Sequence, residues 1–149
     1  MSQFAFLQGE WSAVHDAAAR AEAAVHAEPR TACFYARRAL ELAAAWAYKH
    51  DAALKLPYQD NLSALIHEPS FKQTVGEAVF SKARVINTLG NRAVHGHRAI
   101  PLDDAMVEVR ELFHVTYWLA RSDGRAARPA PGLAFDASAW PKATPPVRG

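Results

Sequence analysis

Apolar residues recur at three- and four-residue steps along most of the first 122 positions of the chain, which is the pattern of amphipathic helices. This spacing predicts a first helix over about 10–27 and a second over 29–50. Pro29 suits the first turn of the second helix, because a backbone N–H is not needed there. Only a short link separates the two helices, so we expect them to pack as antiparallel neighbours.

The next part of the chain predicts a loop and a short helix. Residues 51–60 form a loop that Pro57 closes. Asp60 is the expected N-cap of a short helix that ends before Pro69, since an aspartate side chain can accept a hydrogen bond from the first free N–H groups.

Two long helices follow. The first of them is expected over about 71–95, and Gly96 is well placed to end it. Gly76 and Gly90 each weaken it by about 1 kcal/mol relative to alanine. Asp103 or its neighbour is expected to cap the last helix, which continues to about position 121. The whole pattern predicts an all-α bundle of four long helices plus one short helix.

The helical pattern stops near the C-terminus, where five of the nine prolines follow position 128. We expect residues 1–122 to form one helical domain and residues 123–149 to form a Pro/Ala-rich linker or disordered tail. The alternative is that residues 135–141 dock on the bundle, because Phe135 and Trp140 would otherwise be exposed.

Composition narrows the class of protein. Half of the residues are hydrophobic, which is enough for a packed core in one domain. Cys33 is the only cysteine, so neither an intrachain disulfide nor a cysteine-based zinc site can form. No apolar stretch approaches the ~18 residues that a membrane span needs, and the N-terminus lacks the features of a secretory signal. We expect a cytoplasmic protein with no cofactor and no bound metal.

The charge of the chain is small overall but uneven. The net charge is +2, yet no acidic residue lies between Glu77 and Asp103. An acid-free window concentrates positive potential, and phosphate backbones are its natural partners. The window supplies the candidate nucleic-acid-binding residues Lys82, Arg84, Arg92, His95, His97 and Arg98. The alternative is an ordinary solvated helix face.

Asn91 and His95 are the candidate catalytic pair. They stand four residues apart, so on a helix they share one face. An amide beside an imidazole can fix the tautomer and orientation of the ring, which suits a general acid or base. The alternatives are that His95 caps the end of its helix or is simply buried.

These residues lie in a stretch, LGNRAVHG (89–96), that resembles the signature helix of HEPN domains, usually Arg-Asn-three residues-His. Gly90 stands where that signature has arginine. This variant resembles the domain that precedes the helicase in type I restriction R-subunit-like proteins. The segments FAFLQGEW (4–11), ARRALEL (36–42) and LPYQDNLSALI (56–66) are similar to that domain too, so the resemblance covers about residues 3–121.

The resemblance implies a HEPN-like bundle that pairs as a homodimer through the helices bearing the motif. In active HEPN ribonucleases the arginine stabilises a phosphate and the histidine transfers or orients a proton, across the dimer interface. Only Asn91 and His95 match here, and Gly90 offers no side chain, so we expect a non-catalytic domain. Arg92 with His97 offers a substitute pair one frame later, and Arg84 lies two turns before Asn91.

Three functions follow as hypotheses. The first is an accessory domain of a bacterial restriction or defence helicase, which recognises nucleic acid or a protein partner and continues past Gly149 into helicase or nuclease domains. The second is a metal-independent ribonuclease that uses His95 with a displaced arginine such as Arg92. The third is a structural dimerisation bundle without a nucleic-acid role.

Overall fold

The computed structural model describes residues 2–124, 129 and 132–139. Within these residues the chain is all-helical and contains no strand, which confirms the predicted fold class. The helices are α1 (Ser12–Ala24), α2 (Pro29–His50), α3 (Leu62–His67), α4 (Pro69–His95) and α5 (Leu102–Asp123), with two single 3-10 turns, η1 (Ala5–Leu7) and η2 (Ala137–Ala139). Four helices are therefore long and one is short, as expected.

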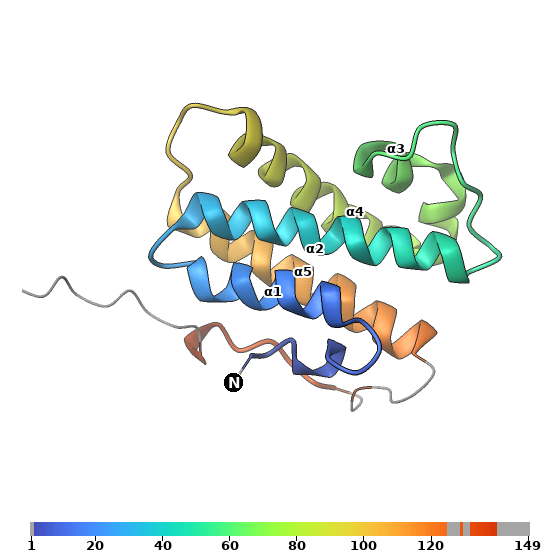
Figure 1. The fold of residues 1–149 in the computed structure, drawn as a ribbon, viewed down its shortest axis with the longest axis horizontal. Helices are drawn as coiled ribbons and strands as arrows, with labels where there is room; N and C mark the ends of the chain where they lie inside the picture. Colours follow the sequence, from blue (N-terminus) through green and yellow to red (C-terminus); the bar gives the residue numbers. More distant parts are fainter. Residues whose placement is uncertain (1, 125–128, 130–131, 140–149) are drawn as a thin grey trace, which may run out of the picture.

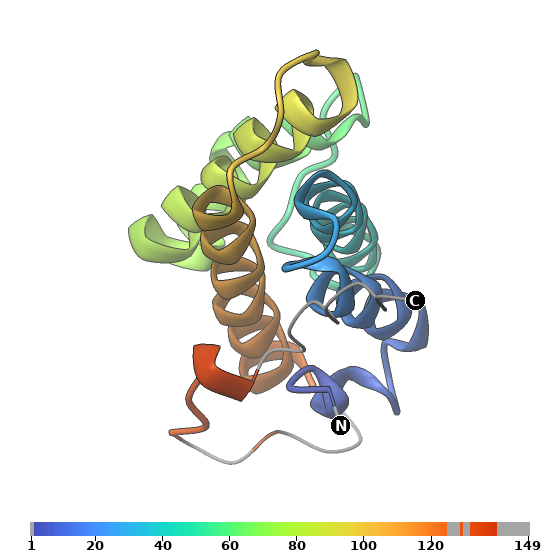
Figure 2. The same ribbon diagram turned by 90° about the vertical axis from the view of Figure 1, so that its left-hand side faces the viewer.

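The second helix is the centre of the bundle. It packs against α1, α4 and α5, and α4 and α5 also pack against each other (Figure 1). Figure 2 shows α5 running alongside α4, with α1 and α2 together on the other side of the view. Short α3 lies against α4. Because α2 reaches every other long helix, it fixes where the end of α4 lies.

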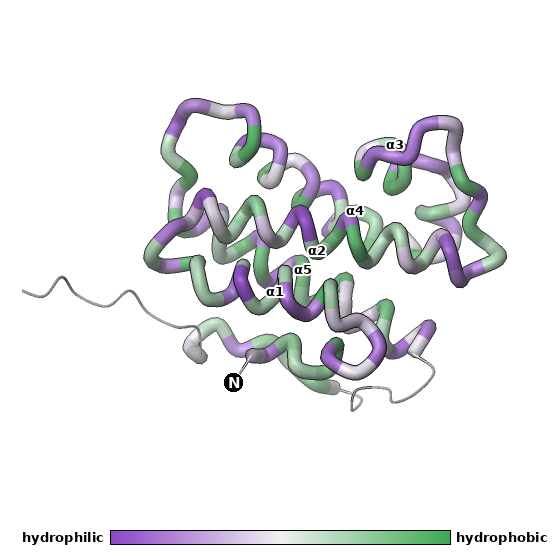
Figure 3. The backbone as a smooth tube through the Cα atoms, in the orientation of Figure 1, coloured by the Kyte–Doolittle hydropathy of each residue, from purple (hydrophilic) through white to green (hydrophobic). Residues whose placement is uncertain are grey.

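Alanine explains the close packing of α2 against α1. These helices bury apolar residues, and much of what they bury is alanine. Figure 3 shows apolar positions recurring along both helices between polar ones. Small side chains let helix axes approach closely and lose no side-chain entropy on burial. The buried alanines of the two helices are Ala17, Ala18, Ala21, Ala32, Ala36, Ala39, Ala43, Ala44 and Ala47.

Aromatic residues from the N-terminus close one side of the bundle. Phe4 is fully buried, and its ring meets the ring of Phe113 edge-on at 5.9 Å. Phe6 approaches the same ring at 5.7 Å. Residues before α1 therefore belong to the folded domain.

The first helix is shorter than the periodicity predicted. It begins at Ser12 because the preceding residues form a separate turn, in which the N–H of Trp11 bonds to the carbonyl of Leu7 at 2.9 Å. It ends at Ala24, ahead of Glu28, whose backbone is not helical. A residue before proline is biased away from helical backbone, and Glu28 precedes Pro29.

The caps also differ from the prediction. Asn61, not Asp60, caps α3, with its Oδ1 accepting from the N–H of Ala64 at 2.9 Å. Asparagine and aspartate are equally good caps, so the pattern could not choose between neighbours. Asp103 does not cap α5 but lies in its first turn, where an acid suits the positive end of the helix.

The fourth helix is broken at Gly76, where the backbone has φ 87° and ψ 167°. Residues that carry a side chain rarely adopt this backbone conformation. Glycine is therefore required at position 76 and does not simply weaken the helix. The helix begins at Pro69, earlier than predicted, and Gly96 ends it as predicted.

Part of the C-terminal segment packs on the bundle. The ring of Phe135 lies 5.3 Å from that of Phe113. Gln3 exchanges two hydrogen bonds with the backbone of Asp136, at 2.8 and 2.7 Å. This agrees with the docking alternative for Phe135, whereas Trp140 and much of the expected 123–149 tail lie outside the described residues. No helix in the described part of the chain is long and apolar enough to cross a membrane.

Candidate nucleic-acid interface

The six predicted basic residues lie at the C-terminal half of α4 and in the loop after it. Lys82, Arg84, Arg92 and His95 belong to the helix, while His97 and Arg98 follow its cap. All except half-buried Lys82 are exposed.

Lys82 is held in an ion pair. Its Nζ lies 2.7 Å from Oε2 of Glu111 on α5. Burial alone would raise the pKa of the Glu111 carboxyl, but the hydrogen bond and charge of Lys82 hold that pKa below its ordinary value. Glu111 therefore neutralises the charge of Lys82, which contributes little to the binding of an external ligand.

Arg84 and Arg92 lie at the two ends of one shallow groove on the outer face of α4. The groove is lined by Ser81, Arg84, Val85, Thr88, Leu89 and Arg92. Arg92 follows Arg84 by eight positions, which is about 12 Å along a helix. The Arg84 guanidinium lies 5.7 Å from the centre of the Phe80 ring, which fixes its direction.

A second groove follows directly. It is lined by Arg92, Gly96, His97, Arg98, Ala99, Ile100, Pro101 and Asp104. Arg92 lines both grooves, so the two form one surface, which we call the basic track and define as Arg84, Arg92, His97 and Arg98. Asp104 is the one acidic residue in the lining of either groove.

Arg30, at the start of α2, holds the end of α4 in place. Its Nη1 donates to the carbonyls of Ala93 at 2.6 Å and Gly96 at 3.1 Å, and its Nη2 donates to the carbonyl of Arg98. The last carbonyls of a helix lack partners and carry partial negative charge. The guanidinium satisfies them and offsets a charge that would repel phosphate.

Sequence reasoning did not identify Arg30. No local pattern could have done so, because its partners lie more than 60 positions further along the chain.

Position 90 has no room for a side chain, because Arg37 of α2 occupies the space beside Gly90. A Cβ at position 90 would lie 2.5 Å from the Arg37 Cβ and 2.7 Å from its Cδ, which is too close for real atoms. Gly90 is buried. No side chain fits here without a shift of α2, so an arginine at this position is excluded by packing as well as absent from the sequence.

The candidate catalytic residues Asn91 and His95 lie in the last turns of α4. Asn91 is half-buried and His95 is exposed, and no hydrogen bond joins them within the described residues. Arg92 and His97 lie on opposite sides of the helix end at Gly96, although both line the second groove. The structure therefore brings basic side chains together around a groove.

A buried acid lies under this region. Glu108 of α5 is fully buried, and its carboxyl oxygens have no hydrogen-bond partner within the described residues. Burial raises its pKa to about 9, although Cys33 and Arg37 nearby lower it in part. Burial also raises the pKa of the Cys33 thiol. Cys33 is thus a buried thiol, with no thiolate available as a nucleophile.

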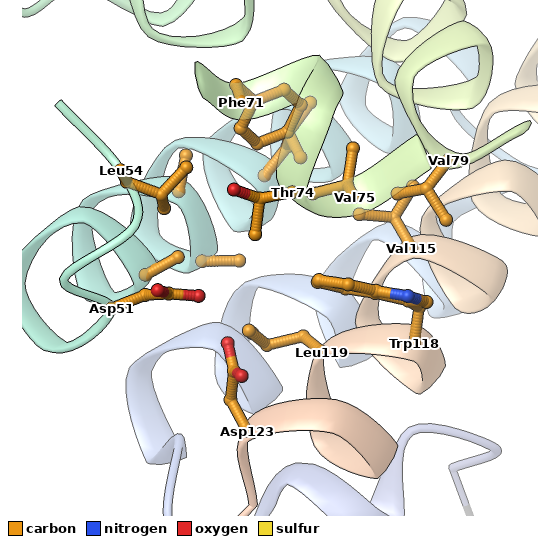
Figure 4. Close-up of a pocket in the computed structure, with 14 residues that line it drawn as sticks. Asp51, Leu54, Phe71, Thr74, Val75, Val79, Val115, Trp118, Leu119 and Asp123 are labelled. Atoms are coloured by element: carbon orange, nitrogen blue, oxygen red, sulfur yellow. The ribbon is translucent and has the colours of Figure 1, made fainter. Parts of the chain in front are cut away.

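A separate apolar cavity lies between α2, α4 and α5 (Figure 4). Its volume is about 30 Å³, space for roughly one water molecule. Phe71, Val75, Val115 and Trp118 are among its walls, and Asp123 lies at its edge. It is too small for a cofactor. In the described part of the chain, no three His, Cys, Asp or Glu side chains are grouped as metal ligands.

Fold and surface together define a small helical bundle with one basic edge. Residues 19–128 match the family described as a domain of unknown function, DUF4145, and the chain belongs to that family. No curated protein and no solved structure matches the chain.

Proposed function

We propose that this chain is a non-catalytic accessory domain that binds nucleic acid through the basic track. The observation that carries the proposal is the position of Arg92. It joins the groove bearing Arg84 to the groove bearing His97 and Arg98, so the cations follow one line as phosphates do along a strand.

The surroundings of the track support this role. Arg30 offsets the negative end of α4, leaving Arg92 and Arg98 free to attract an external anion. Asp104 is the single acid beside them. A local excess of cations on a nearly neutral domain gives modest, salt-sensitive affinity rather than strong general binding.

The proposed absence of catalysis rests on Gly90 and His95. Position 90 has no room for an arginine. His95 has no hydrogen-bond partner among the described residues that would fix its tautomer. The hydrogen bond made by one ring nitrogen sets which tautomer a catalytic histidine presents.

We also propose that the domain works in the cytoplasm, attached to or assembled with the helicase or nuclease parts of a restriction or defence system. The resemblance over residues 3–121 to the HEPN-like domain of type I restriction R-subunit-like helicases supports this context. A homodimer is proposed with it.

The test is a gel-shift titration of labelled single-stranded RNA, single-stranded DNA and duplex DNA. The double variant Arg92→Glu/Arg98→Glu is compared with Lys49→Glu, an exposed charge reversal at the opposite end of the bundle (Figure 1). We expect the double variant to lose most binding and Lys49→Glu to retain it. Each lost phosphate contact should flatten the plot of log affinity against log salt by about one unit. Equal binding by both variants would refute the basic track.

The ribonuclease remains a second candidate because Arg92 and His97 line the same groove. It predicts metal-independent cleavage of single-stranded RNA that stops in His95→Ala or His97→Ala. Intact RNA at enzyme excess, under conditions where binding is complete, would exclude it.

A further inference from the structure

We propose that Phe34 is a base-stacking platform at the edge of the basic track, so that the interface takes single-stranded nucleic acid in preference to duplex. This inference rests on the proposed function and adds its ligand class. It involves α2, a helix that carries none of the basic residues singled out above from the sequence.

Phe34 is unusual in its exposure. It lies on the central helix of the bundle, yet 47% of its surface is open to solvent. Exposed large aromatics are found more often at binding sites than on inert surface, because burying the ring would otherwise stabilise the fold.

Two contacts place one face of α2 beside the end of α4. Arg30 bonds to the carbonyl of Ala93, and the side chain of Arg37 lies over Gly90. Arg30 and Arg37 are two turns apart and share a face of α2. Phe34 lies between them on that face, four residues after the first and three before the second. Figure 1 shows the first half of α2 running beside the last half of α4.

The facing rim of α4 is also open and apolar. Val94 follows Gly90 by one turn and is 44% exposed. Asn91 and His95 lie beside Val94 on the outward side of the helix. The exposed side chains of Phe34 and Val94 thus lie along the line where α2 and α4 meet. The amide of Asn91 and the imidazole of His95 are close to Val94 and can bond to base edges.

The ring of Phe34 is held in place before any ligand binds. It meets the Tyr35 ring edge-on, with centroids 5.2 Å apart. The Tyr35 hydroxyl accepts a hydrogen bond from Nη1 of Arg20 at 3.3 Å, and the same guanidinium lies 5.5 Å from the Tyr35 ring. A ring that is already ordered loses little entropy when a base stacks on it.

Charge favours nucleic acid over an apolar peptide as the ligand. Glu41 is the acid nearest along this face of α2, and it is shared by Arg37 and Arg38, each 3.6 Å away. One positive charge is therefore left over beside Phe34. Aromatic rings interleaved with cations are the usual platform for single strands, because every base has a π-face to stack.

Duplex nucleic acid cannot use such a platform, since its bases are already stacked on one another. Replacing an aromatic side chain on which one base stacks lowers affinity by roughly 5- to 150-fold, the equivalent of about 1–3 kcal/mol. Phe34→Ala should weaken binding to oligo(dT) and oligo(rU) within this range and leave duplex binding unchanged. Comparable losses of affinity for oligo(dT) and oligo(rU) indicate a platform for single strands in general. A loss for only one of them identifies whether DNA or RNA is the ligand.

The experiment compares Phe34→Ala, Phe34→Trp and Tyr58→Ala by fluorescence anisotropy. Tyr58→Ala is the control, because Tyr58 is a fully exposed aromatic in the loop at the far end of α2. Phe34→Trp should bind at least as well as the wild type and show added quenching on oligo(dT) beyond that of the four native tryptophans.

The outcomes separate the two proposals. If Arg92→Glu/Arg98→Glu loses binding but Phe34→Ala binds single strands as Tyr58→Ala does, the stacking platform is wrong and the basic track stands. If Phe34→Ala weakens duplex and single-strand binding equally, stacking is also wrong. If the wild type binds no nucleic acid at 50 mM salt (about the low end of ordinary binding buffers), both proposals fall.

Discussion

The side chain of Arg37 lies against Gly90 so closely that a Cβ at position 90 would be 2.5 Å from the Arg37 Cβ. One contact thus accounts for two separate parts of the sequence pattern, the ARRALEL run on α2 and the glycine of the LGNRAVHG stretch on α4. The contact gives a packing reason for the glycine at position 90 and places Arg37 where the two helices cross.

Gly90→Ala should destabilise the protein. Alanine ordinarily stabilises a helix by about 1 kcal/mol relative to glycine, but here the new methyl group forces α2 and α4 apart, which costs about 1–3 kcal/mol. Arg37→Ala should not rescue it, because the nearest atom is the Arg37 Cβ, which alanine keeps. Urea unfolding of the single and double variants measures this. A more stable Gly90→Ala would contradict the close contact.

Gly76→Ala should also destabilise, but for a different reason. No atom lies within 4 Å of a Cβ at this position, so crowding plays no part. The cost comes from the backbone at φ 87°, which a side chain strains, and is about 1–3 kcal/mol. Gly9→Ala, where space is also open and φ is not positive, is the matched control for the same unfolding measurement. Equal stability of the two variants would show that α4 is not broken at Gly76.

The buried carboxyl of Glu108 should make the free energy of unfolding fall as the pH rises. Burial raises its pKa to about 9 in the folded chain, whereas the unfolded carboxyl titrates near 4.5. Between these values the folded chain holds one more proton than the unfolded chain, so a rise in pH lowers the free energy of unfolding. Glu108→Gln should remove this dependence and raise the free energy of unfolding at pH 7 by on the order of 3 kcal/mol.

Glu111→Gln serves as the comparison, since the pKa of Glu111 is shifted the other way. Its carboxylate contributes stability above its unfolded pKa, and that stability is lost as the pH falls through the folded pKa. Glu111→Gln should therefore be less stable than the wild type at pH 7. Urea titrations at pH 5 and pH 8 test both variants. Parallel pH dependence in Glu108→Gln and the wild type would count against a protonated buried acid.

Arg30→Ala should loosen the end of α4. It leaves the carbonyls of Ala93, Gly96 and Arg98 without their guanidinium donor, at a cost of about 1–3 kcal/mol. Amide hydrogen exchange should rise over residues 94–100 and remain unchanged in α1. Nucleic-acid affinity should fall too, although Arg30 touches no ligand in the proposal, because His97 and Arg98 lose their fixed position. Unchanged exchange would show that the loop is held by other contacts.

The sequence predicted the helices well because helix signals are local. Apolar periodicity placed α2 with its ends at Pro29 and His50, and Gly96 marked the end of α4. Errors came where local signals compete, as between Asp60 and Asn61, or where an adjacent turn extends a pattern, as before Ser12.

The site was less predictable, since its organisation depends on contacts between distant parts of the chain. The basic residues themselves were visible as a window without acids. That Lys82 is bound by Glu111, and that Arg30 holds the loop, could not be inferred from spacing along one helix. Phe34 was overlooked for the same reason, because its exposure depends on how α2 and α4 cross.

The hydrogen bonds between Gln3 and Asp136 bring the two ends of the described chain together on one edge of the bundle, opposite the loop that follows α4 (Figures 1 and 2). The chain therefore enters and leaves the described fold at that shared edge. A neighbouring domain could then be attached, or the bundle inserted as a unit into a larger protein, with the basic track still facing outward.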